Sequence, residues 1–227
     1  MKNPNKIFIK SVLFDLDGTL VDTNIDFDLM RNEIFIKSEE YGVEKNLLKG
    51  LDILAMIEKA FEIINIANDK KTADKYYNEI YQILENIEIK HAKNTKPIHY
   101  SSELFASLKK YGIKIGIITR NCKKASRISL EIAGLEPDIT IAREDCKIHK
   151  PNPNPILMAL DLFNTKSDFS IMIGDHPMDI MSGKSAGVKT IGFLRDNKPN
   201  NYFDEINPDY IISSLEEVLD VIVNCNS

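Results

Sequence analysis

The feature that most constrains this chain lies at residues 13–20, where an apolar run ends abruptly in two carboxylates one residue apart. Residues 7–14 are rich in the aliphatic and aromatic side chains that strands prefer, so we expect a buried strand there. Asp15 and Asp17 follow it. Positions i and i+2 of a strand share a face, so these carboxylates point at one spot unless the chain turns between them. Two carboxylates that close repel each other unless a cation or a shared proton lies between them.

Gly18 and Thr19 complete this motif. Gly18 allows a sharp turn and a close approach of the backbone to a ligand. Thr19 adds a hydroxyl that either binds a phosphate or caps the turn. An Asp-Gly pair on its own usually marks an ordinary turn, so the case for a functional site depends on the rest of the chain.

A long helical segment follows the motif. Between residues 22 and 96, apolar residues recur at three- and four-residue steps, in stripes that begin at Phe27, Leu47 and Ala73. This spacing is typical of amphipathic helices that pack against each other. It predicts an inserted helical cap domain at residues 22–96, and a core domain made of residues 1–21 and 97–227.

From residue 100 onward the chain alternates between helical and strand patterns. We expect strands at 113–118, 138–142, 169–173, 188–193 and 209–212, and helices at 102–111, 125–133, 151–163, 177–186 and 215–223. Such alternation means a mainly parallel sheet that helices cover on both faces. The predicted fold is therefore α/β, a three-layer Rossmann-like parallel-sheet core with an inserted α-helical cap domain. Ligands of such folds bind beyond the carboxyl ends of the strands.

Polar and charged residues stand where four of these strands end. They are Asp15 and Asp17 after the first strand, Thr119, Arg120 and Asn121 after the second, Lys150 after the third, and Asp175 and Asp179 after the fourth. Each has an ordinary explanation when taken alone, such as a helix cap or a solvated charge. Four coincidences at the same end of four consecutive strands favour one shared site.

This set resembles the motifs of the haloacid dehalogenase superfamily of phosphohydrolases. The matching residues are Asp15-Leu16-Asp17-Gly18-Thr19-Leu20-Val21-Asp22, Thr119, Lys150-Pro151 and Gly174-Asp175-His176-Pro177-Met178-Asp179. The chain is most similar to the phosphoglycolate-phosphatase-like branch, whose cap is an α-helical C1 cap. The motifs span the whole core, whereas the cap resembles the family only in its position and its helicity.

The resemblance implies an enzyme that hydrolyses a small phosphate monoester through an aspartyl-phosphate, the substrate being phosphoglycolate-like, a sugar phosphate or a nucleotide phosphate. Asp15 is then the nucleophile, and the Asp17 side chain protonates the leaving oxygen and later deprotonates the attacking water. The implied cofactor is Mg²⁺, with Asp15, the backbone carbonyl of Asp17 and the Asp175 carboxylate as ligands.

The resemblance also assigns roles to three further residues. Thr119 and neighbouring backbone N–H groups hold the phosphoryl oxygens, and Lys150 balances their charge. Asp179 lies outside the ligands of the metal and orients either a water on the metal or Lys150.

The sequence identifies the residues that select the substrate less clearly than those of the reaction. Candidates are Arg120 and Asn121 in the core, together with Arg31 and Lys49 in the cap. The family usually has Asn directly after the Thr position, whereas Arg120 intervenes here, and it either reaches the phosphate or faces solvent. His176, inside the last motif, is more simply a loop residue than a metal ligand.

Two alternatives to the phosphatase stay open, namely a sugar-phosphate mutase like β-phosphoglucomutase on the same core, and a non-catalytic relative that binds a phosphorylated ligand. A dehalogenase of this fold fits less well because it lacks an acidic residue at the position of Asp17. A signalling receiver domain has no helical insertion and carries its phosphorylated Asp on a later strand.

Composition narrows the expected partners. The net charge of −5 argues against general nucleic-acid binding. No apolar run approaches the ~20 residues that a membrane span needs. The three cysteines show no metal-ligand spacing and fit a reducing compartment. We therefore expect a cytoplasmic monomer or homodimer that acts on a small phosphorylated metabolite, without nucleic-acid or membrane partners.

Overall fold

The computed structural model describes residues 9–225, which divide into two compact units. One unit contains the described residues up to Thr23 and from Lys93 onward, and the other contains Asn24–Ala92. The inserted unit thus begins at Asn24 rather than at residue 22 and ends at Ala92 rather than at residue 96. That this insertion works as a cap stays a prediction.

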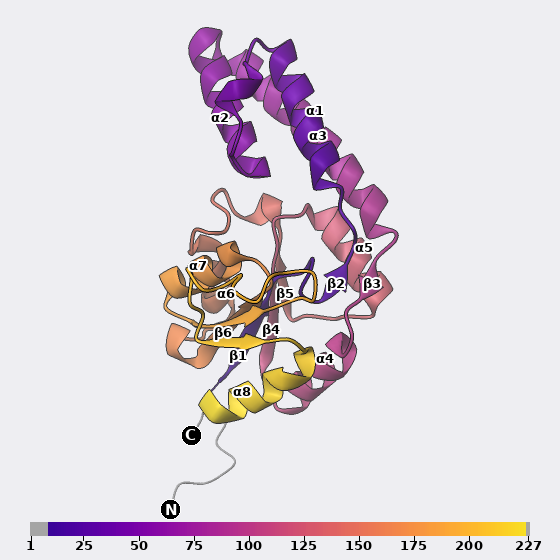
Figure 1. The fold of residues 1–227 in the computed structure, drawn as a ribbon, viewed down its shortest axis with the longest axis vertical. Coiled ribbons are helices and arrows are strands. Elements are labelled where there is room, and N and C mark those ends of the chain that lie inside the picture. Colours follow the sequence, from indigo (N-terminus) through magenta and orange to yellow (C-terminus); the bar gives the residue numbers. More distant parts are fainter. Residues whose placement is uncertain (1–8, 226–227) are drawn as a thin grey trace, which may run out of the picture. The chain divides into compact units, whose positions relative to one another are not determined.

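The core unit is built around a parallel sheet of six strands (Figure 1). The strands are β1 (Ser11–Phe14), β4 (Lys114–Ile118), β5 (Ile139–Ile141), β6 (Ser170–Gly174), β7 (Lys189–Phe193) and β8 (Tyr210–Ile212). Their spatial order is β5-β4-β1-β6-β7-β8, and every neighbouring pair is parallel. Because β1 lies inside the sheet between β4 and β6, the residues after Phe14 stand between the ends of those two strands.

A second, two-stranded sheet lies where the chain leaves the core and returns to it. β2 (Val21–Asp22) pairs antiparallel with β3 (Lys96–Pro97). The sequence pattern changes to helical after Val21 and changes back at Pro97. These two residues lie opposite each other in the small sheet.

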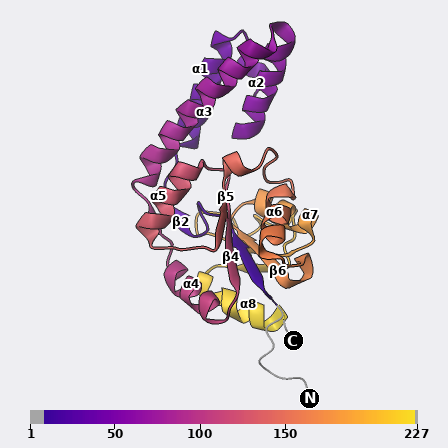
Figure 2. The same cartoon turned by 180° about the vertical axis from the view of Figure 1, so that it is seen from behind.

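Helices flank the core sheet (Figures 1 and 2), and the described residues form five α-helices in this unit. They are α4 (Ser101–Lys110), α5 (Lys123–Ala133), α6 (Asn154–Phe163), α7 (Pro177–Ala186) and α8 (Val218–Cys225). Residues of α4, α5 and α8 share one apolar cluster with the sheet, and residues of α6 and α7 share another. This three-layer α/β arrangement confirms the predicted fold class.

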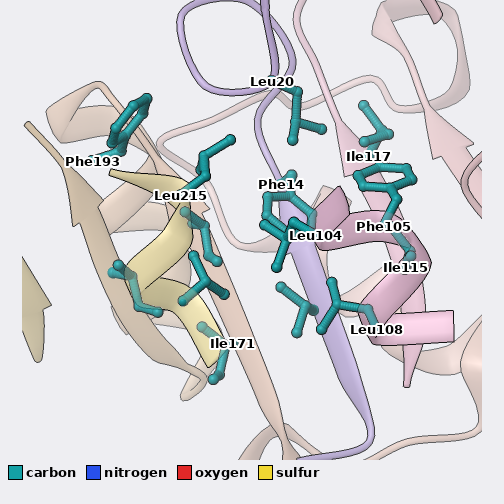
Figure 3. Packing of buried hydrophobic residues seen from close by; sticks show 14 of the residues in the cluster. Phe14, Leu20, Leu104, Phe105, Leu108, Ile115, Ile117, Ile171, Phe193 and Leu215 are labelled. Atoms are coloured by element: carbon teal, nitrogen blue, oxygen red, sulfur yellow. The ribbon is translucent and has the colours of Figure 1, made fainter. Parts of the chain in front are cut away.

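β1 shows why its sequence is apolar without interruption. Successive side chains point to opposite faces of a strand, and both faces of this sheet are covered. Phe14 lies in the cluster with α4, where its ring centroid is 5.8 Å from that of Phe105 (Figure 3). Leu13 lies in the other cluster, and neither side chain is exposed.

The inserted unit has an apolar core of its own. Its helices are α1 (Phe27–Glu40), α2 (Ile53–Ala67) and α3 (Lys70–Ala92). Tyr76 is fully buried there, and its hydroxyl lies 2.9 Å from that of Ser38. One predicted stripe is partly wrong, because α2 begins at Ile53, whereas Leu47 lies in a short 3₁₀ helix (Lys45–Leu47) and is 53% exposed. Among the described residues, no helix has both the length and the apolar character needed to cross a membrane.

Candidate active site

The two aspartates after β1 have different partners. Oδ1 of Asp15 lies 2.6 Å from Nζ of Lys150. The carboxylate of Asp17 instead accepts hydrogen bonds from the Thr23 hydroxyl and from the side-chain amide of Asn121. The strand ends at Phe14 and the chain turns there, so the two carboxylates do not share one spot.

Gly18 shapes the turn that follows β1. Its φ of +90° belongs to the left-handed region that favours glycine. A Cβ atom at this position would also lie 2.7 Å from Cγ of Asp175. The glycine therefore allows the turn to pass directly against the Asp175 carboxylate.

Thr19 connects the same turn to the end of β6. It is fully buried, and its hydroxyl accepts a hydrogen bond of 3.1 Å from the backbone N–H of Asp175. We expected this hydroxyl either to bind a phosphate or to cap its own turn. The structure gives it a different partner, since β1 and β6 are neighbours in the sheet.

Lys150 lies at the centre of the site, with a side chain that is only 3% exposed. Its ammonium donates to Oδ1 of Asp15 at 2.6 Å, to Oδ1 of Asp179 at 2.6 Å and to the carbonyl of Ile118 at 2.7 Å. These three acceptors match the three N–H bonds of an ammonium. Burial alone would lower the pKa of Lys150, but the charges and hydrogen bonds of Asp15 and Asp179 outweigh it and raise that pKa.

The start of α7 positions Asp179. The second oxygen of its carboxylate, Oδ2, accepts a hydrogen bond of 3.1 Å from the backbone N–H of His176. Nδ1 of His176 in turn accepts from the N–H of Met178 at 3.2 Å, so this histidine caps the helix. Gly174 leaves the space that Asp179 fills, because a Cβ on Gly174 would overlap the Asp179 side chain.

Three carboxylates converge beside Lys150. Asp15, Asp175 and Asp179 each offer an oxygen, and these oxygens lie within 4.8 Å of one another. Burial raises the pKa of Asp15 to about 6, with Lys150 lowering it and Asp179 raising it further. Burial, followed by the charges of Asp15 and Asp179, raises the pKa of Asp175 to about 7. The ionised cluster is therefore costly by itself and suited to a hard cation with oxygen ligands, as Mg²⁺ is.

The end of β4 supplies three predicted residues. Thr119 is buried, and its hydroxyl accepts a hydrogen bond of 3.2 Å from the backbone N–H of Asn121. The side chain of Asn121 holds Asp17. The Arg120 side chain lies against α7, with Nη1 2.8 Å from Sδ of Met178.

The predicted cap residues have contrasting surroundings within the inserted unit. Nη1 of Arg31 donates to the carbonyl of Leu51 at 2.7 Å and lies 3.5 Å from Sδ of Met56. Lys49 is exposed. Contact of either residue with a substrate stays a prediction.

One group of residues beside the site was absent from the sequence prediction. The loop after β7 carries Arg195 and Lys198, and both charges lower the pKa of Asp175 against its burial. Arg195 pairs with Asp22 at 3.1 Å. The rule that selected the other four strand ends also applies here, because β7 ends at Phe193 and Arg195 follows two residues later.

A family model decides to which family the chain belongs. Residues 12–193 match the model described as haloacid dehalogenase-like hydrolase. The chain belongs to the haloacid dehalogenase-like hydrolases. The matched segment runs from β1 to β7, and the predicted family and the predicted enzyme class, a phosphatase of this family, are confirmed.

Named relatives cover nearly the whole chain. The "Putative pyrophosphatase PpaX" of Caldanaerobacter subterraneus subsp. tengcongensis is 31% identical over 220 residues, 96% of this chain and 96% of that protein. A solved structure from Bacteroides fragilis, a "Putative haloacid dehalogenase-like hydrolase", covers 92% of this chain and 99% of its own, with 24% identity and a TM-score of 0.68.

A second solved structure is described with its metal. The "putative HAD-hydrolase YfnB" of Bacillus subtilis, described as bound to magnesium and as revealing interdomain movement, has 20% identity and a TM-score of 0.62. It covers 94% of this chain and 98% of its own. At these identities the two solved structures support the haloacid dehalogenase-like fold alone.

Proposed function

We propose that this haloacid dehalogenase-like hydrolase is a Mg²⁺-dependent phosphatase that hydrolyses a small phosphate compound through an aspartyl-phosphate on Asp15. The observation that carries the proposal is the contact of Asp15 with the buried Lys150, next to the carboxylates of Asp175 and Asp179. A largely shielded carboxylate with a fixed countercharge on one oxygen is suited to attack a phosphorus atom.

Asp15 forms a P–O bond with the phosphoryl group in the first step, and the bond from phosphorus to the leaving oxygen breaks. Lys150 keeps its proton throughout, because its raised pKa and two carboxylate partners hold it charged. It balances the negative charge that the phosphoryl group brings to the buried site.

Asp17 acts as the general acid and base in the two steps. Its side chain gives a proton to the leaving oxygen and then takes one from the water that hydrolyses the aspartyl-phosphate. The hydrogen bonds from Thr23 and Asn121 support this role, because they hold the carboxylate apart from Asp15 and in one orientation.

Thr119 is assigned to the phosphoryl oxygens. Its hydroxyl oxygen already accepts from the N–H of Asn121, which leaves the hydroxyl hydrogen to donate to a ligand. Thr119 is buried at the end of β4, next to β1 in the sheet, which supports a place close to Asp15.

The donor set of the site fits Mg²⁺. We assign the ligands to the carboxylates of Asp15 and Asp175 and to the backbone carbonyl of Asp17. Mg²⁺, when bound, supplies the positive charge that two approaching anions require. Asp179 is assigned outside this set, since Lys150 and the His176 N–H already occupy its two oxygens.

The substrate is assigned only by class, as a small phosphorylated metabolite. The name of the relative from Caldanaerobacter makes inorganic pyrophosphate the first compound to test, followed by small monoesters. We propose that Arg31 and Lys49 of the inserted unit, with Arg120 of the core, contribute to the choice among esters.

Release of inorganic phosphate from p-nitrophenyl phosphate tests the proposal. Asp15→Asn should lose at least about a thousandfold in kcat, because an amide is a poor nucleophile and each factor of ten is ~1.4 kcal/mol. Asp161→Asn removes an exposed carboxylate on α6 and is the matched control, expected to match the wild type. Turnover by Asp15→Asn within tenfold of the wild type, or wild-type turnover unaffected by EDTA, would contradict the proposal.

A further inference from the structure

The loop that follows β7 carries a cation that the proposed reaction does not use. β7 and β6 are paired in register, with Gly192 opposite Gly174. The chain therefore leaves β7 at the same edge of the sheet where Asp175 follows β6. Lys198 lies in this loop, which spans residues 194–209 before β8 begins at Tyr210.

Aromatic packing holds the loop against the core. Phe203 is fully buried, and a Cβ on Gly192 would lie 2.9 Å from two carbons of its ring. The ring of Tyr202 meets that of Phe203 nearly edge to face, with centroids 5.1 Å apart. Lys184 of α7 fixes the far side of the loop by donating to the carbonyl of Ile206 at 2.7 Å.

Lys198 lies over one ring of this aromatic pair. Its Nζ atom lies 4.7 Å from the centroid of the Tyr202 ring, and its side chain is half-buried. Arg195, in the same loop, is already paired with Asp22. Lys198 forms no ion pair with a carboxylate among the described residues, so its charge remains available to an anion.

Lys198 belongs to the segment that leaves β7 at the edge of the sheet where Asp175 follows β6. Lys150, by contrast, is hydrogen-bonded to Asp15, so the two lysines serve different parts of the site.

We propose that Lys198 is a specificity-determining residue that binds a second phosphate of the substrate, carried by the leaving group rather than transferred to Asp15. The inference rests on the proposed function. The transferred phosphoryl group already has Lys150 as its countercharge, so a second positioned cation matches a second anion. The substrate class that fits is a phosphoanhydride, of which a diphosphate is the simplest member.

Two substrates that differ in their leaving group test the role of Lys198 in turnover. Lys198→Met keeps the apolar stem on Tyr202 but removes the charge. It should raise KM for inorganic pyrophosphate by about tenfold, as loss of a charge-assisted hydrogen bond does, and leave kcat/KM for p-nitrophenyl phosphate within about twofold. Lys198→Arg should restore the affinity for pyrophosphate. Lys110→Met, on an exposed residue of α4, is the control for a lost surface charge.

Binding of unreactive analogues decides the inference even without turnover. Titration calorimetry at fixed free Mg²⁺ should show that Lys198→Met weakens methylenediphosphonate by about tenfold and leaves methylphosphonate unchanged. Equal loss for both compounds, loss for neither, or no preference of the wild type for the diphosphonate would overturn the inference. A wild type that hydrolyses p-nitrophenyl phosphate through Asp15 but shows any of these results keeps the proposed function and refutes only the role of Lys198.

Discussion

The hydroxyl of Thr19 accepts a hydrogen bond of 3.1 Å from the backbone N–H of Asp175, a residue 156 positions later in the chain. The contact joins the turn after β1 to the turn after β6. Gly18 lets the same turn press against the Asp175 carboxylate. The two loops that carry the proposed metal ligands are therefore held together by a residue that we do not assign as a ligand.

Substitution of Thr19 should disturb the site through Asp175. Thr19→Val keeps the buried shape but leaves the N–H of Asp175 without its acceptor, at a cost of about 1–3 kcal/mol. We expect a lower Tm and a higher Mg²⁺ concentration for half-maximal activity. Thr19→Ser keeps the hydroxyl and should retain wild-type Mg²⁺ dependence. Unchanged Mg²⁺ dependence in Thr19→Val would show that this contact does not position Asp175.

The raised pKa of Asp175 predicts that Asp175→Asn stabilises the metal-free protein, and that this stabilisation depends on pH. The pKa rises from 3.8 to about 7 on folding, first through burial and then through Asp15 and Asp179. The folded protein thus binds this proton more tightly than the unfolded chain, and stability falls as pH rises from about 4 to about 7. Asparagine carries no charge, so Asp175→Asn should exceed the wild type in Tm by a few degrees at pH 7.5 and by less at pH 4.5.

Two controls distinguish the titration of Asp175 from a general change in stability. Asp161→Asn should show a difference from the wild type that does not grow with pH. Addition of Mg²⁺ at pH 7.5 should raise the Tm of the wild type and leave that of Asp175→Asn nearly unchanged. A pH-independent difference for Asp175→Asn would mean that Asp175 does not titrate with a raised pKa.

The bond from Asn121 to Asp17 predicts a defect in rate rather than in metal binding. Asn121→Ala removes a donor that orients Asp17, and we expect kcat to fall by about ten- to a hundredfold, part of what general acid–base catalysis contributes. The Mg²⁺ concentration for half-maximal activity should change by less than about twofold, because no proposed metal ligand is altered. Thr23→Val, which also removes a donor to Asp17, should act in the same direction. Asn86→Ala, on an exposed residue of α3, is the control. A normal kcat in both Asn121→Ala and Thr23→Val would contradict the proton-transfer role of Asp17.

Substitutions of the two predicted cap residues, Arg31 and Lys49, should differ in their effect on the stability of the protein. Arg31→Ala loses the charged hydrogen bond to the Leu51 carbonyl, and we expect the free energy of unfolding to fall by about 1.5–3 kcal/mol. Lys49→Ala alters an exposed side chain and should stay within about 0.5 kcal/mol of the wild type.

Substrate choice then tests the proposed role of the insertion. In a panel of phosphate esters, Lys49→Ala should change the ranking of kcat/KM while hydrolysis of p-nitrophenyl phosphate stays close to wild type. Arg31→Lys retains a donor and is the fair comparison for Arg31. A uniform loss on every ester, with folding intact, would place these residues in the general chemistry.

The strands and their polar ends were predictable because each depends on a local pattern. The apolar run before Asp15 reads as a buried strand, since both of its faces are covered, and Asp175 ends another run of the same kind. The parallel arrangement brings such ends to one edge of the sheet. These two facts place Asp15, Lys150, Asp175 and Asp179 together without any knowledge of side-chain contacts.

The partners of those residues were not predictable, because they depend on contacts between distant segments. Thr19 meets Asp175 only because β1 and β6 are adjacent, and Asp17 meets Asn121 only because the chain turns after Phe14. Leu47 followed the spacing of an α-helix, yet it lies in a short 3₁₀ helix outside α2. Lys198 stands in an irregular loop, where neither periodicity nor a motif marks it.

Chemical trapping of Asp15 during turnover tests the central claim most directly. Enzyme that is hydrolysing substrate is quenched and treated with borohydride, which reduces an acyl phosphate to an alcohol, and the peptides are sequenced by mass spectrometry. An aspartyl-phosphate on Asp15 predicts homoserine at position 15, only when substrate and Mg²⁺ are both present. Unmodified Asp15 under conditions of rapid turnover, or homoserine at position 17 or 175 instead, would contradict the account.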